Sequence, residues 1–172
     1  MGWTTPKTWS VGEVVTAANM NLHLRDNLNA LYQVAKMKAS NETVNNSTTL
    51  QNDDHLVLAV NASTKYTLVA FLIGFADNDT PDIKIKWILP TGGTMRWAEL
   101  RELGAGTQAL TELTEVSEAA LPTTNANKIF LFTGAVTIAG TAGNVQLQWA
   151  QNILTAVNVK LLTSSFFTLT EI

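Results

Sequence analysis

The hydrophobic and polar positions of this chain follow two different periods. Between Thr16 and Lys38 apolar residues recur at intervals of three and four, the spacing of one face of an α-helix. Beyond residue 50 short runs alternate between apolar and polar residues, which is typical of β-strands with one buried face. The period changes within residues 39–49, a polar stretch without periodicity that predicts a linker.

The alternating region predicts an antiparallel β fold. In the clearest run, Ile83, Ile85 and Trp87 alternate with lysines, which predicts a strand with one face toward the core and one face exposed to solvent. Residues 108–121 fit either a helix or a strand, and we interpret them as a strand or an irregular edge. About eight or nine short strands with turn signals between them are typical of a sandwich or jelly roll. The predicted fold class is therefore mainly β, an antiparallel jelly-roll-like sandwich preceded by one N-terminal α-helix.

The predicted helix begins at Thr16, whose hydroxyl can accept a hydrogen bond from a free backbone N–H. A helix of this length is marginal in water unless its apolar stripe is covered, either by the chain's own β domain or by neighbouring subunits. We favour neighbouring subunits, because Asn27 falls on the stripe and could pair with copies of itself to set the register. The apolar members of the stripe are Ala17, Met20, Leu24, Leu31 and Val34.

The first 15 residues carry Trp3 and Trp9 in a segment too irregular to hold a core of its own. These rings either pack back on the helix or sheet, or insert into a partner protein, where Trp is favoured as a buried contact. We therefore predict an attachment arm and oligomerisation helix over 1–38, a linker over 39–49 and a β-sandwich over 50–172. The predicted partner or oligomer interface comprises Trp3, Trp9, Met20, Leu24, Asn27, Leu31 and Val34.

Composition narrows the function classes. Hydrophobic residues make up 46% of the chain and charged residues only 15%, so the chain can bury a core under a largely uncharged surface. A net charge of −3 gives no electrostatic footprint for nucleic acid. The absence of cysteine excludes disulfides, thiolate metal sites and Cys nucleophiles. The longest apolar run, residues 68–76, is too short to cross a bilayer, and we expect no membrane insertion.

Candidate chemistry is sparse. His55 follows two aspartates and could ligate a metal with them, but further ligands at a recognisable spacing are missing, so we favour a hydrophilic strand entrance. Asp77, Asp79 and Asp82 share one loop that lacks the Gly and distal Glu of an EF-hand, which favours a solvated turn over a calcium site. We assign no catalytic residue, cofactor or metal ligand, and expect no enzymatic activity.

The N-terminal sequence GWTTPKTWSVGEVVTAANMNLHLRDNLNAL resembles the start of many bacteriophage and prophage virion proteins, whose pattern is approximately W-T-T-P-x-T-W-x-x-G-E-x-V-T-A-x-x-x-N-x-H-L-R-D-N-L. The segments LQNDDHLVLAV, FLIGFADNDTPDIKIKW, PTGGTMRWAEL and GNVQLQWAQN resemble a β domain of phage tail-fibre and minor tail proteins. The positions that match the N-terminal pattern are Trp3, Thr4, Thr5, Pro6, Thr8, Trp9, Gly12, Glu13, Val15, Thr16, Ala17, Asn21, His23, Leu24, Arg25, Asp26, Asn27 and Leu28.

This resemblance implies a structural component of the virion, assembled in the host cytoplasm, that contacts other virion proteins and forms a homo-oligomer, expected to be a trimer. Both a tail-fibre or minor tail position and a capsid-decoration or head-fibre position fit it. The alternative is a carbohydrate-binding adhesin module that contacts a host-surface glycan, which would need aromatic rings exposed near a loop. The sequence favours core packing over an exposed sugar-binding platform for three tryptophans, because each lies on the apolar side of its strand. These residues are Trp87, Trp97 and Trp149.

Overall fold

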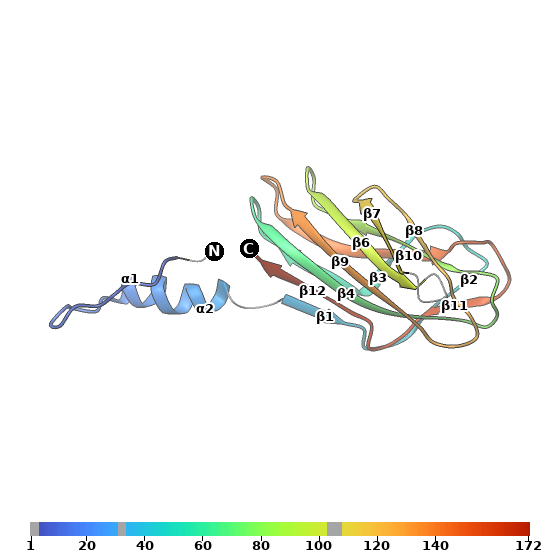
Figure 1. Cartoon of the computed structure of the whole chain (residues 1–172), viewed down its shortest axis with the longest axis horizontal. Coiled ribbons are helices and arrows are strands. Elements are labelled where there is room, and N and C mark those ends of the chain that lie inside the picture. Colours follow the sequence, from blue (N-terminus) through green and yellow to red (C-terminus); the bar gives the residue numbers. More distant parts are fainter. Residues whose placement is uncertain (1–3, 31–33, 103–107) are drawn as a thin grey trace.

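The computed structural model of the chain describes residues 4–30, 34–102 and 108–172. An N-terminal helical segment lies beyond the ends of the strands of a β-sandwich, not over either of its faces (Figure 1). Among the described residues, no helix has the length and hydropathy that a bilayer span requires. The predicted fold class is confirmed: the chain is mainly β, with two antiparallel sheets and one short N-terminal helical segment.

The helical segment consists of α1 (Ala17–Met20), the π-helical turn η1 (Asn21–Arg25) and α2 (Asp26–Ala30). The predicted N-cap is confirmed, because the side chain of Thr16 accepts a hydrogen bond of 3.2 Å from the backbone N–H of Asn19. The helix is shorter than predicted, since Val34–Met37 form a strand, β1. Strand β1 pairs with β12 (Phe166–Glu171), which would otherwise be an edge strand with unpaired backbone groups.

The larger sheet has eight strands in the order β1-β12-β4-β9-β6-β7, and β11 extends it by pairing with β4 and β2. Strand β2 (Glu42–Asn45) falls within residues 39–49, so part of the predicted linker belongs to this sheet. The other strands of the sheet are β4 (Lys65–Ala76), β6 (Thr94–Glu102), β7 (Gln108–Thr114), β9 (Lys128–Thr137) and β11 (Asn158–Leu161).

The smaller sheet has four strands in the order β3-β10-β5-β8. Strands β7 and β8 both come from residues 108–121, so the interpretation of that ambiguous stretch as strand is confirmed. The strands of this sheet are β3 (Gln51–Val60), β5 (Ile83–Ile88), β8 (Ala119–Leu121) and β10 (Gly143–Gln151).

One hydrophobic core lies between the two sheets, built from the alternate residues that the sequence predicts to face inward. Trp87, Trp97 and Trp149 are all buried in it, as predicted. The rings of Trp87 on β5 and Phe167 on β12 lie 5.1 Å apart between centroids, and this contact joins the two sheets. Gly134 lies opposite Trp97 in the ladder, where an added Cβ would lie only 2.9 Å from the Cβ of Trp97.

Candidate assembly interface

The N-terminal arm folds back along the helical segment and is held there by Asn27. The side-chain oxygen of Asn27 accepts from the backbone N–H of Thr4 at 2.9 Å, and its amide nitrogen donates to the carbonyl of Thr4 at 2.9 Å. The same nitrogen donates to the carbonyl of His23 at 3.2 Å. The amide is buried by its own chain, so the arm satisfies the group for which we predicted pairing between copies.

A closed turn shapes the middle of the arm. The backbone N–H of Glu13 donates to the carbonyl of Ser10, and the Glu13 carboxylate accepts from the backbone N–H of Ser10 at 3.2 Å. Lys7 forms an ion pair with Glu13, and Gly12 in the turn has a φ of +81°. The hydrogen bond from Lys7, followed by that from the Ser10 backbone, holds the pKa of Glu13 below its ordinary value.

Trp9 packs partly against its own helix. Its ring meets the ring of His23 edge-on at 6.2 Å between centroids, and the ammonium of Lys7 lies 5.0 Å from the Trp9 ring. Despite these contacts, Trp9 remains 38% exposed. The structure therefore supports the packed-back interpretation in part and leaves an aromatic surface accessible.

Apolar side chains cover the outside of the arm and helical segment. Met20 and Leu24, from the predicted stripe, are 43% and 48% exposed, and Leu28 is 67% exposed. None of the hydrophobic side chains described between residues 4 and 30 is buried. The π-helical turn breaks the regular α-helical spacing, so exposed apolar residues are no longer confined to one stripe. The members that the sequence pattern did not single out are Val11, Val14, Val15, Leu22 and Leu28.

The remaining predicted interface residues lie at the limits of the described chain. Trp3 and Leu31 fall outside the described residues. The backbone of Val34 belongs to β1, where it lies opposite Leu169, and its side chain is not described. Val34 is thus part of the sheet and not of the helical stripe.

A second apolar surface crosses the outer face of the larger sheet. Register places the members of this row directly opposite one another on β1, β12, β4, β9 and β6. Two of its rings stack with centroids 5.6 Å apart, and its aliphatic members are between 42% and 59% exposed. Sequence reasoning missed this row because only the register aligns it. The row, called the outer apolar row below, consists of Met37, Phe166, Phe71, Leu131 and Leu100.

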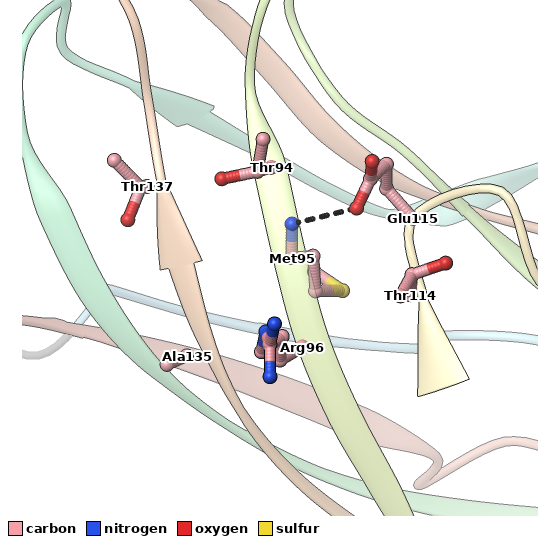
Figure 2. A pocket seen from close by; sticks show the side chains of 7 residues that line it. All are labelled: Thr94, Met95, Arg96, Thr114, Glu115, Ala135 and Thr137. Atoms are coloured by element: carbon pink, nitrogen blue, oxygen red, sulfur yellow. Dashed lines mark hydrogen bonds between the residues drawn. The ribbon is translucent and has the colours of Figure 1, made fainter. Parts of the chain in front are cut away.

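A polar cavity of about 430 Å³ opens between β6, β9 and the end of β7 (Figure 2). The carboxylate of Glu115 closes one side of it by accepting from the backbone N–H of Met95 at 3.1 Å, and this bond helps to lower the pKa of Glu115. The indole N–H of Trp97 donates to the carbonyl of Thr114 at 3.0 Å, so this ring is not an exposed sugar platform. The lining residues are Thr94, Met95, Arg96, Thr114, Glu115, Ala135 and Thr137.

The predicted Asp–His cluster gains two members from elsewhere in the chain. Ligand atoms of Glu42, Asp53 and His55 all lie within 4.8 Å of one another. The ammonium of Lys38 lies 2.6 Å from Asp53 and 2.9 Å from Glu42, so a cation of the chain itself already neutralises these carboxylates. This arrangement favours an internal ion pair over a metal centre.

Asp77 and Asp82, two aspartates of the 77–82 loop, have separate partners. Asp77 accepts from Asn158 at 2.8 Å and from Lys160 at 3.1 Å, and these two hydrogen bonds lower its pKa. Asp82 accepts from the backbone N–H of Thr123 at 3.1 Å. Within the described residues these carboxylates do not converge on a common point where a calcium ion would bind.

Comparison with known proteins returned no matching family model and no matching curated protein. Among solved structures, the chain is similar to the VP2 subviral particle of infectious bursal disease virus, with 12% identity and a TM-score of 0.25 over 82% of this chain and 41% of that chain. Structures of the Gx and Gt strains of the same virus give 14% and 12% identity, TM-scores of 0.22 and 0.21, and coverage of 82% of this chain and 40% and 41% of theirs. The chain thus spans about two fifths of the chains that it matches.

Proposed function

We propose that this chain is a structural protein of a bacteriophage particle, in which the arm and helical segment attach a displayed β-sandwich. The observation that carries the proposal is the inverted arrangement of residues 4–30, whose buried side chains are polar and whose apolar side chains face outward. Exposed apolar clusters of this kind mark surfaces that other protein covers. The resemblance of the N-terminal pattern to phage virion proteins supplies the virion context.

In this proposal the chain is a homo-oligomer, with a trimer as the expected closed form. The helical segment and the outer apolar row are the two surfaces that copies of the chain or other virion proteins cover. Neither surface requires a catalytic residue or a cofactor. Whether the particle position is the tail or the capsid does not change these contacts.

The oligomer is tested first by light scattering of the purified chain. We expect a mass about three times the 18.6 kDa of one chain. The double variant Leu24→Asp, Leu28→Asp places two charges on the exposed helical surface and should shift the mass toward one chain, because charges are costly at an apolar interface. A matched control is Leu154→Asp, at a leucine in the sandwich that is 61% exposed and belongs to neither surface.

Incorporation into particles tests the virion role separately. Deletion of residues 1–30 retains β1, and the remaining chain should stay soluble but fail to enter particles. Normal incorporation of the shortened chain would contradict the anchoring role of the arm. If light scattering gives the mass of a monomer for the wild-type chain, the trimer is excluded, and the proposal is reduced to attachment of single chains to another virion protein.

The carbohydrate-binding alternative loses its expected platform, since Trp87, Trp97 and Trp149 are buried. A glycan array probed with the wild-type chain and with Arg96→Ala addresses the polar cavity of Figure 2 directly. Reproducible glycan binding that is lost in the variant would favour an adhesin over a purely structural role.

A further inference from the structure

The side chain of Lys38 lies fully buried just after the last residue of β1, the strand that follows the helical segment. Its Nζ lies 2.6 Å from Oδ2 of Asp53 and 2.9 Å from Oε1 of Glu42. The side chain of Asp53 is also fully buried. Each of the other ion pairs identified in the described residues has at least one partner that is partly exposed. An amine and a carboxyl group are therefore held in contact away from bulk water.

The two oxygens of the Asp53 carboxyl group have different partners. Its Oδ1 accepts from the backbone N–H of His55 at 2.9 Å and from that of Leu56 at 2.8 Å. Two backbone donors aimed at one carbonyl oxygen stabilise the negative charge that develops there when a nucleophile attacks the carbon. The other oxygen, Oδ2, faces the lysine amine.

Glu42 contacts the amine directly, and one of its carboxylate oxygens lies within 4.8 Å of a carboxylate oxygen of Asp53. Its Oε1 contacts Nζ of Lys38 and accepts from the backbone N–H of Asp54 at 3.0 Å, while Oε2 accepts from the indole N–H of Trp149 at 3.2 Å. Burial raises the pKa of Glu42, but the hydrogen bonds from Lys38, Asp54 and Trp149 together hold it below its ordinary value. Glu42 is thus ionised at neutral pH and can accept a proton.

We propose that Lys38 and Asp53 condense to form an amide cross-link within the chain, with Glu42 as the proton shuttle. Glu42 takes a proton from Nζ, and the free amine attacks Cγ of Asp53 to form the N–C bond. Both protons that leave Nζ end on Oδ2, the C–Oδ2 bond breaks, and Oδ2 departs as water. The ammonium and carboxylate of the ion pair contain every atom of the amide and the water, so the step needs no oxidant, reductant or co-reactant.

Burial favours the amide over the ion pair. Two charges in an apolar interior are costly, and condensation replaces them with one neutral group. The cross-link would join residues 15 positions apart and connect the end of β1, in the larger sheet, to β3 in the smaller sheet. A pull on the arm would then reach both sheets through a covalent bond. The cross-link therefore adds a mechanical role that the proposed function does not require.

Mass spectrometry of the intact, denatured chain tests the cross-link directly. We expect the wild-type chain to lack the mass of one water molecule, and a protease digest to yield one branched peptide containing both Lys38 and Asp53. The variants Lys38→Met and Asp53→Ala should show the full mass, and Glu42→Gln should show it or lose water far more slowly. The control Asp77→Ala, which breaks the half-exposed pair with Lys160, should lose water as the wild type does.

The wild-type measurements decide the proposal even if a variant does not fold. A wild-type chain that keeps its full mass after prolonged incubation at neutral pH overturns the cross-link and leaves a buried ion pair. Loss of water without a branched peptide also overturns it, because cyclisation of an aspartate with its own backbone releases water as well. Asp53→Asn sharpens the result, since condensation would then release ammonia in place of water.

Discussion

The sandwich and the N-terminal segment bury opposite kinds of side chain. Between the sheets the buried residues are mainly apolar and include three tryptophans. Within residues 4–30 the buried side chains are Asp26 and Asn27, and the leucines and valines face outward. The sandwich is stabilised by apolar burial within one chain, whereas the arm is held to its helix by the hydrogen bonds of Asn27 with Thr4 and by the ring contact of Trp9 with His23. The difference leaves the apolar side chains of the arm and helical segment exposed in the single chain, and in the proposed function other protein covers them.

The magnitudes support this division. Burial of one leucine or valine side chain contributes about 1.5–3 kcal/mol. Leu24 and Leu28 are 48% and 67% exposed, so covering both would contribute about as much as burying one whole leucine, roughly twice the net energy of about 0.5–1.5 kcal/mol typical of one internal hydrogen bond. A partner that covers this surface has a larger effect on the segment than any single contact within it.

The same substitution in the two regions should give the largest difference. Trp87→Ala removes a ring from the core and should lower the free energy of unfolding by about 3–5 kcal/mol. Trp9→Ala removes a ring that contacts His23 and Lys7 and stays partly exposed, and should cost the isolated chain about 0.5–1 kcal/mol. Chemical denaturation followed by circular dichroism measures both. Equal losses would show that the arm is integral to the sandwich and would break the comparison.

A smaller and more local effect should follow from Asn27→Ala. Loss of the amide leaves both backbone groups of Thr4 without their partner and should weaken arm docking by about 1–3 kcal/mol. Hydrogen exchange and limited proteolysis should detect the release of residues 4–15, with the unfolding midpoint of the sandwich unchanged. The exposed Asn21→Ala is the matched control and should leave exchange in the arm as in the wild type. A global loss of stability in Asn27→Ala would contradict the independence of the two regions.

The smallest effect should appear as a pH dependence confined to the arm turn. The pKa of Glu13 is lower in the folded chain than its ordinary value of 4.5, so its stabilising effect is present above that pH. As the pH falls below 4.5 and through the folded value, protonation breaks the contacts with Lys7 and Ser10. Tryptophan fluorescence or amide exchange at Ser10 should report the opening. Glu13→Gln should already be open at neutral pH and show no such transition.

Local patterns in the sequence were enough to predict much of the fold. Alternation at Ile83, Ile85 and Trp87 identified β5 and its inward face, because side chains on a strand alternate between faces whatever the partner strand is. Thr16 was recognisable as a helix cap because its hydrogen bond spans only three residues. The sequence pattern placed Val34–Met37 in the helix, since four residues fit either period. Pairing with β12, near the other end of the chain, makes this segment a strand.

The candidate sites depended on long-range packing in a way that the fold class did not. The outer apolar row exists only because four ladders bring Met37, Phe71 and Leu131 into one register. The carboxylate of Glu42 meets the indole of Trp149 across 107 positions, and no spacing in the sequence encodes that contact. Secondary structure and inward faces follow from short-range periodicity, so the sequence alone determined them. Which polar groups meet inside the sandwich follows from strand order and register, and only the tertiary structure decided it.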